Sequence, residues 1–141
     1  MEDKKEPQRI PAIRPLGKKI WVVPDGYLPA STEAEPQSSG GYRSHETLSI
    51  VNTGDAPANC RLDVYFEDGP PWLDQPFVIE ARRSLHLRMD RLAALGLRQI
   101  PEAVPYSAVV RADRPVVVQQ SRLDTTQANL ALFTTVAFGV E

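Results

Sequence analysis

Thirteen prolines are spread through this chain, and no long segment repeats apolar residues at the spacing of an amphipathic helix. Proline has no backbone N–H and clashes with the preceding helical turn, so it interrupts helices and is common in turns. The sequence therefore predicts an all-β fold with many turns. The exception is one short helical turn over 91–95, which Asp90 is expected to cap and Gly96 to end.

The segment 60–67 has the clearest strand pattern. Its apolar residues alternate with polar ones, so that one face carries Cys60, Leu62, Val64 and Phe66 and the other Arg61, Asp63, Tyr65 and Glu67. Such alternation is typical of a strand buried on one side. Further strands are predicted at 19–23, 46–52, 77–81, 84–89, 106–112, 116–123 and 130–138. About eight strands in two sheets predict an antiparallel, jelly-roll-like β-sandwich.

The last three predicted strands are apolar at both alternating positions. Val116, Val117 and Val118 are consecutive, and the residues from Leu130 to Phe133 are all apolar. A strand with two apolar faces is covered on both, and in an all-β domain the second cover is often another subunit. We therefore expect the C-terminal strands to form a homo-oligomer interface.

Length, charge and cysteine content limit the function classes. A chain of 141 residues fits one domain that folds without disulfides or metals. Cys60 is the single cysteine, which excludes an internal disulfide and a cysteine-based zinc site. The net charge of −2 disfavours a dedicated nucleic-acid binder. The chain has no apolar stretch of roughly 18 residues and no signal-peptide pattern, so a cytoplasmic protein is expected.

Residues 1–18 are expected to form a flexible N-terminal arm, and residues 19–141 the single β-sandwich domain. Pro7, Pro11 and Pro15 recur at every fourth position and prevent a stable helix. Five basic residues against three acidic ones leave the arm a net charge of +2, too little for an electrostatic anchor. The loop over 30–41 is expected to be mobile, and loops of this length are often functional.

The segment 116–127 carries the densest group of side chains that can bind a ligand. It begins as a buried strand and then becomes polar, with Gln119, Gln120, Arg122, Asp124 and Gln127. Alternation places Gln120, Arg122 and Asp124 on one face. Amide, guanidinium and carboxylate groups orient polar ligands or connect subunits. The alternative interpretation is a solvated strand end.

Two charged residues are predicted at inward positions. Glu46 alternates with Leu48, and Arg83 alternates with Leu85. An unpaired charge inside a sandwich costs several kcal/mol, so we expect Glu46 and Arg83 to pair with each other or with one ligand. The two interpretations are a structural ion pair and a polar pocket shared with segment 116–127.

Five sequence elements are informative together, in their order and spacing. They are Trp21 with Gly26-Tyr-Leu-Pro29, Ser44-His-Glu-Thr47, Asn52-Thr-Gly-Asp55, Ala81-Arg-Arg83 and Val116–Gln127. The Asn-Thr-Gly-Asp turn occurs in many unrelated sandwiches, whereas the other elements are more specific. With them the chain resembles the sensory rhodopsin transducer family of small prokaryotic proteins, over about residues 19–138.

The resemblance implies a jelly-roll-like sandwich that assembles as a homotetramer. One family member resembles the soluble partner of a membrane photoreceptor, and this role does not extend to the present chain from sequence alone. The resemblance to the wider family also implies that the chain binds small molecules such as sugars. The arm of residues 1–18 lies outside the shared region.

The expected ligand is a polar small molecule such as a sugar, because an aromatic ring beside planar polar groups matches a sugar face. The candidate residues are Trp21, Tyr27, His45, Glu46, Arg83, Gln120, Arg122 and Asp124. No cofactor is expected. We thus expect a non-enzymatic binding and signalling protein.

Two other functions are considered. One is a ligand-free adaptor that engages the cytoplasmic face of a membrane receptor. The other is a metal-assisted jelly-roll enzyme with a His45–Glu46–His86 site, which is disfavoured because the closely spaced His-x-His pair of such sites is absent. Nucleophilic catalysis is disfavoured too, since there is no Gly-x-Ser-x-Gly motif and Cys60 lies at an inward strand position.

Overall fold

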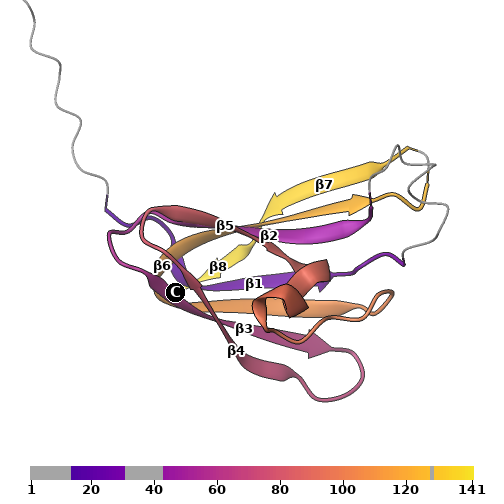
Figure 1. Cartoon of the computed structure of the whole chain (residues 1–141), viewed down its shortest axis with the longest axis horizontal. Coiled ribbons are helices and arrows are strands. Elements are labelled where there is room, and N and C mark those ends of the chain that lie inside the picture. Colours follow the sequence, from indigo (N-terminus) through magenta and orange to yellow (C-terminus); the bar gives the residue numbers. More distant parts are fainter. Residues whose placement is uncertain (1–13, 31–42, 128) are drawn as a thin grey trace, which may run out of the picture.

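The computed structural model describes residues 14–30, 43–127 and 129–141, which form two packed layers of antiparallel strands (Figure 1). The strands are β1 (Lys18–Gly26), β2 (His45–Asn52), β3 (Ala58–Phe66), β4 (Trp72–Ile79), β5 (Arg83–Arg88), β6 (Tyr106–Asp124), β7 (Ala131–Val136) and β8 (Phe138–Val140). A single 3₁₀ helix, η1 (Met89–Leu95), lies within the described residues. The predicted antiparallel β-sandwich is confirmed. No helix of the described ranges is long and apolar enough to cross a membrane.

Strand β6 joins the two layers. Its first part, from Tyr106, pairs with β1 and β3, and its second part, to Asp124, pairs with β2 and β7. The sequence predicts two strands here, whereas the structure has one strand of 19 residues that bends near Pro115 and runs back in the other layer (Figure 1). Proline has no N–H to donate to a ladder. It is tolerated at the bend because Pro115 has no ladder partner among the described strands.

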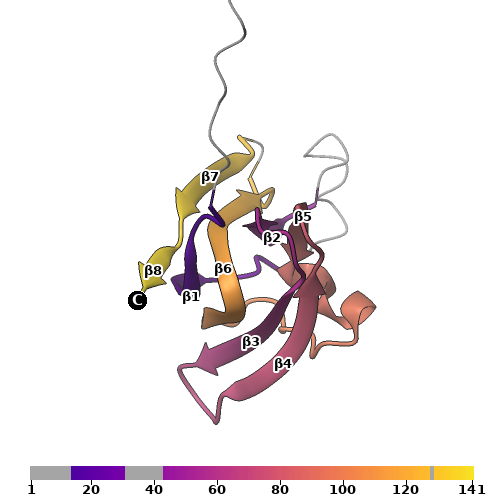
Figure 2. The same cartoon turned by 90° about the vertical axis from the view of Figure 1, so that its left-hand side faces the viewer.

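Each layer takes the name of an interior strand that belongs to it alone, because β6 belongs to both layers. The β3 layer has the order β4-β3-β6-β1-β8, and the β2 layer has the order β5-β2-β6-β7. Figure 2 shows η1 beside the open edge between β4 and β5. Leu92 and Met89 of η1 are completely buried there. They extend the core that the inward residues of both layers form, such as Leu48, Leu62 and Val118.

Several predicted boundaries differ from the structure. Strand β4 begins at Trp72 rather than at 77, and the last predicted strand is divided into β7 and β8. Asp90 does not cap η1: it lies inside the helix, and its carboxylate oxygens accept hydrogen bonds from Arg88 at 2.7 Å. Gly96 ends η1 as predicted, with a left-handed φ of 75°.

The predicted N-terminal arm lies mostly outside the described residues, which begin at residue 14. Its last part is attached to the domain, since the Leu16 N–H donates to Thr53 Oγ1 at 2.8 Å and Lys18 already belongs to β1. The predicted mobile loop over 30–41 also falls outside the described residues from position 31 onward.

Candidate functional site

A completely buried carboxylate lies at the end of the sandwich where β1 ends and β2 begins. Glu46 is 0% exposed. Its Oε1 accepts hydrogen bonds from the Tyr27 N–H at 2.8 Å and from the Tyr106 hydroxyl. Its Oε2 accepts from Gln120 Nε2 at 3.0 Å and from Arg122 Nε at 2.9 Å. These groups are called the Glu46 cluster below.

The bend of β6 explains how this cluster forms. Glu46 lies directly opposite Arg122 in the β2 layer, and both side chains point inward. Tyr106 begins the same strand β6 in the opposite layer. Because β6 runs back on itself, its first residue, Tyr106, and Arg122, which follows sixteen positions later, both reach the Glu46 carboxylate.

Arg122 connects the cluster to the β1 turn. Its Nη2 lies 3.3 Å from the Asp25 carbonyl oxygen and 3.4 Å from the Asp25 carboxylate. Gln120 Nε2 donates to the same carbonyl at 2.6 Å. The guanidinium also lies over the Phe133 ring, 5.0 Å from its centre, a favourable cation–π geometry. The cluster therefore fixes the position of β1 relative to β6 and β7.

The protonation states in the cluster follow from burial and charge. Burial raises the pKa of Tyr106, and the neighbouring Glu46 carboxylate raises it further, so its hydroxyl stays protonated and donates. For Arg122, burial acts to lower the pKa, but the attraction of Glu46 and Asp25 outweighs it and the pKa is raised. The cluster thus combines a neutral phenol with a permanent cation.

A surface groove lies beside the cluster, between β1 and the β7–β8 segment. Its volume is about 280 Å³. Its lining includes Asp25, Gln120, Phe133 and Phe138. The Asp25 side chain is 81% exposed, so its carboxylate can accept hydrogen bonds from a bound molecule. This surface is called the β7 groove.

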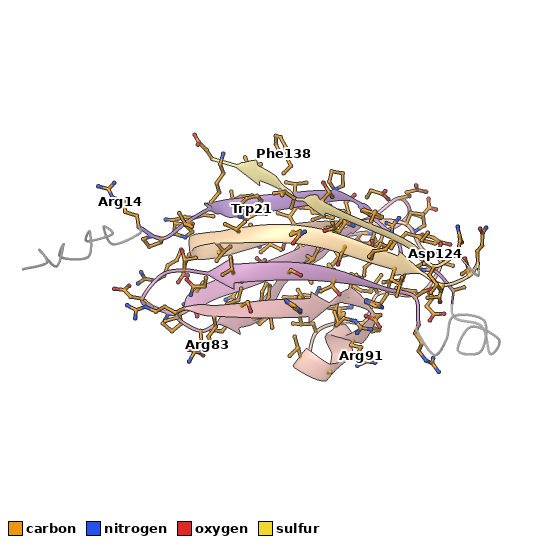
Figure 3. The ribbon with its side chains drawn as sticks, turned by 90° about the horizontal axis from the view of Figure 1, so that it is seen from above. Arg14, Trp21, Arg83, Arg91, Asp124 and Phe138 are labelled. Carbon is orange, nitrogen blue, oxygen red and sulfur yellow. The ribbon has the colours of Figure 1, made fainter. Side chains whose placement is uncertain are left out.

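Arg83 does not pair with Glu46, which corrects the prediction. Glu46 is opposite Arg122, whereas Arg83 is opposite Asn52 at the far end of β2. Figure 3 shows Arg83 at the end of the molecule away from Asp124. Neighbouring antiparallel strands begin at opposite ends, so a residue at the start of β5 cannot meet one at the start of β2. Arg83 is exposed, and its Nη1 donates to the Arg82 carbonyl.

The two predicted aromatic residues do not form a stacking surface in the cluster. Trp21 is buried, and its Nε1 donates to the carbonyl oxygens of Val116 at 2.7 Å and Lys18 at 3.0 Å. That position is near the bend of β6, away from Arg122. Tyr27 belongs to the cluster through its backbone N–H.

The remaining predicted residues have separate contacts. His45 faces the opposite side of β2 from Glu46, and its Nδ1 lies 2.8 Å from the Arg43 carbonyl oxygen. The Asp124 carboxylate accepts bonds from the N–H and hydroxyl of Thr126, and thereby forms a local turn. Of the predicted residues, Glu46, Gln120 and Arg122 meet through their side chains.

The considered metal site is not formed. His86 is opposite Ser49, four residues along β2 from His45, and Glu46 points to the other face of that strand. In the described ranges, no three His, Cys, Asp or Glu side chains are placed to hold a metal ion.

Sequence reasoning missed three residues of the site: Asp25, Tyr106 and Phe133. Asp25 resembles an ordinary turn residue in Pro24-Asp-Gly26, and Tyr106 an ordinary strand start. The useful signal was the inward position of Glu46, which requires several donors in addition to one cation.

The outer face of the β2 layer has an unusual composition. Opposite pairs in the ladders share a face, and the pairings place on it His45, Thr47, Ser49, Val51, Ser84, His86, Arg88, Val117, Gln119, Ser121, Leu123, Leu132, Thr134 and Val136. None of these residues carries a carboxylate, and Arg88 is already paired with Asp90. The outer face of the β3 layer is different, since Arg61, Asp63 and Arg111 lie together there.

The sequence matches a model of a known protein family. The family model described as Anabaena sensory rhodopsin transducer matches residues 16–139. The chain belongs to this family. The resemblance predicted from the five sequence elements is therefore confirmed.

Two solved structures are similar to the chain. The crystal structure of Thermotoga maritima 1070 has 38% sequence identity and a TM-score of 0.75, and the match covers 89% of this chain and 97% of that one. The Anabaena sensory rhodopsin transducer has 29% identity and a TM-score of 0.64, with 77% and 97% covered. The comparison with curated proteins gave no match.

Proposed function

We propose that this family member is a non-enzymatic, cytoplasmic signalling protein that acts through protein contacts. It assembles as a homotetramer and engages the cytoplasmic face of a membrane receptor. The observation that carries this proposal is the outer face of the β2 layer, where none of the described strand residues carries a carboxylate and apolar side chains are exposed. Membership of a family named after a transducer supports the signalling role.

The β2-layer face has the composition of a contact surface. Leu132 and Val136 of β7 are 69% and 65% exposed, and Val51 of β2 is 37% exposed on the same face. Small hydroxyl residues such as Ser49 and Thr134 lie on the same face between these apolar side chains. Depletion of charged residues is what distinguishes the centre of an interface from ordinary surface. An apolar strip on a sheet face marks a binding surface.

The Glu46 cluster supports an adaptor more than a ligand site at its centre. Four donors from the described residues already bond to the two oxygens of the Glu46 carboxylate. A ligand at that position would have to break these bonds, and removing one partner of a buried charge costs about 3–5 kcal/mol. The cluster is therefore assigned a structural role, which keeps β6 and β7 in place under the contact face.

Light scattering tests the assembly. The wild type should have the mass of a tetramer at micromolar concentration. Val136→Glu should reduce that mass, because it places an unpaired carboxylate in the contact face. Val78→Glu is the matched control, since Val78 is 50% exposed on edge strand β4 of the other layer and should leave the mass unchanged. A monomeric wild type, or equal effects of both variants, would contradict the proposal.

The β7 groove supports a second candidate function, binding of a polar small molecule such as a sugar. The rings of Phe133 and Phe138 and the polar groups of Gln120 and Asp25 line one groove. This combination of an apolar face and planar polar partners suits a sugar.

Thermal-shift measurements with sugars, sugar acids and nucleotides test this second function. A binding compound should stabilise the wild type but not Asp25→Ala, whose fold should survive because the Asp25 carbonyl that Gln120 and Arg122 contact is retained. Asp68→Ala is the control, since Asp68 is exposed and does not line the groove. If no compound shifts the wild type, the adaptor function remains alone.

A further inference from the structure

A second groove lies on the other side of the Asp25 turn, at the ends of β1, β3 and β6. Its volume is about 340 Å³. Its wall is formed largely by the rings of Pro24, Tyr65, Phe66 and Pro105. Its two charged residues, Asp25 and Glu67, are both acidic. This surface is called the Tyr65 groove. We propose that it binds the proline-rich basic arm of a second copy of this chain.

The polar groups of the Tyr65 groove define the chemistry of its occupant. The Ser107 hydroxyl already donates to the Pro24 carbonyl at 2.7 Å, and the Tyr106 hydroxyl donates to Glu46. The Asp25 carboxylate is 81% exposed and contacts Arg122 through Oδ1 at 3.4 Å, so its Oδ2 and the exposed Glu67 can accept further hydrogen bonds. Tyr65 is 43% exposed and offers a ring face. The groove therefore suits a cation carried on an apolar, extended segment.

The N-terminal arm has this chemistry in its sequence. Pro7, Pro11 and Pro15 alternate with Arg9 and Arg14 in the segment from 7 to 15. Proline restricts φ, so an extended proline-rich segment loses little entropy when it binds an aromatic groove. An arginine guanidinium stacks on a tyrosine ring and also pairs with a carboxylate. The segment from 7 to 15 carries two arginines and no acidic residue, and the groove carries two carboxylates, so their charges are complementary.

Chain geometry selects a second copy as the source of the arm. Residue Leu16 is bonded to Thr53 at the Lys18 end of β1, whereas the groove lies at the Gly26 end. Figure 3 shows Arg14 and Asp124 at opposite ends of the molecule. Nine strand residues span about 26 Å. Arg9 is five residues before Arg14 and can extend about 18 Å from it. Arg9 therefore cannot reach the groove of its own chain.

This inference rests on the proposed self-association and adds a contact to it. One copy inserts Arg9 and its flanking prolines beside Tyr65 of another, and the guanidinium pairs with Asp25 or Glu67. The contact lies away from the outer face of the β2 layer, so it can form in addition to that interface.

Disulfide trapping between full-length chains tests the contact. Arg9→Cys protein is mixed with Glu67→Cys protein under mild oxidation, and linked dimers are separated by gel electrophoresis. The native Cys60 is buried and does not interfere. Arg91→Cys replaces Glu67→Cys in the control mixture, because Arg91 is exposed on η1 and does not line the groove. Docking should make the groove pair form roughly tenfold faster than the control pair, through its higher effective concentration.

A second measurement separates docking from accidental contact. The Arg9→Cys and Glu67→Cys substitutions remove two of the charges that form the contact. A second pair, Ile10→Cys with Ser107→Cys, keeps Arg9, Tyr65 and both groove carboxylates and is trapped as well, at low and high salt. A charge-assisted contact should be trapped more slowly at high salt, because salt screens Arg9 from the carboxylates.

Three results would overturn the inference. One is equal trapping in the groove and control mixtures, and another is no trapping at all. The third is trapping that is faster within one chain than between two chains. It would be seen as an intrachain disulfide in the double variant Arg9→Cys/Glu67→Cys at nanomolar concentration. Light scattering of the wild type is measured in parallel. A tetramer without groove-specific trapping overturns the arm contact alone, and a monomer overturns the proposed assembly as well.

Discussion

Arg122 holds the buried carboxylate of Glu46 from the neighbouring strand, with Nε and Nη2 both 2.9 Å from Oε2. The sequence predicts an arginine partner for Glu46 but places Arg83 in that role. Arg83 is exposed at the other end of the molecule. The two arginines therefore form a natural pair of probes, one inside the cluster and one outside it.

Replacing Arg122 with Met should strongly destabilise the fold. The variant leaves Glu46 buried without its cation, and breaking a buried ion pair in this way costs about 3–5 kcal/mol. Arg83→Met is the matched control and should stay within about 0.5 kcal/mol of the wild type, as surface substitutions do. Urea unfolding of both variants measures the difference. A cost below about 1 kcal/mol for Arg122→Met would mean that water replaces the guanidinium.

Replacing Tyr106 with Phe should destabilise the fold by less. The variant removes one donor to Glu46 Oε1 and keeps the Tyr27 N–H on the same oxygen. A hydrogen bond to a charged group contributes about 1.5–3 kcal/mol. Tyr65→Phe is the control, because that side chain is exposed. Equal free energies of unfolding for the two variants would contradict the assigned role of the Tyr106 hydroxyl.

The fold was largely predictable because strand alternation is a local property. Cys60, Leu62 and Val64 are buried as their alternation predicts. Asp63 is an exception, since it lies at an outward position but is buried beneath Arg111. The bend at Pro115 was not predictable, because it depends on how β6 pairs in both layers.

The candidate site was predictable in part for the same reason. Alternation placed Glu46 inward and put Gln120 and Arg122 on one shared face, and these three side chains do meet. Alternation does not show at which end of the sandwich a strand begins, because that depends on the order and direction of the strands in the fold. The errors for Arg83 and Trp21 are of this kind, because both were predicted to share a site with Glu46 and both lie away from it along the strands.

Cys60 should resist thiol reagents in the folded protein. It is completely buried. Burial raises the pKa of its thiol to about 11, and the nearby Asp113 carboxylate adds to this effect. Since the thiolate is the reactive form, labelling at pH 8 should be very slow until the chain unfolds. Labelling with a maleimide in buffer and in urea measures this, with free cysteine as the control. Rapid labelling in buffer would show that β3 opens readily.

The ion pair between Asp63 and Arg111 should make stability depend on pH in acid. Arg111 donates to Asp63 Oδ2 from Nε at 2.8 Å and to Oδ1 from Nη2 at 3.0 Å, and the Asp74 N–H donates to Oδ1 at 2.8 Å. The hydrogen bonds from Arg111 are the main reason that the pKa of Asp63 is lowered. In the unfolded chain an aspartate has a pKa of about 3.9.

A lowered folded-state pKa means that the charged carboxylate stabilises the fold above about pH 4, and that this contribution is lost as the pH falls through the folded-state pKa. Asp63→Asn cannot titrate, so the wild type should be more stable than this variant at pH 7, and the difference should shrink below about pH 4. Urea unfolding at pH 7, 5 and 3 measures the difference, with Asp68→Asn as an exposed control. A difference that stays constant from pH 7 to pH 3 would show that the neutral hydrogen bonds of Asp63, and not its charge, stabilise the β3 layer.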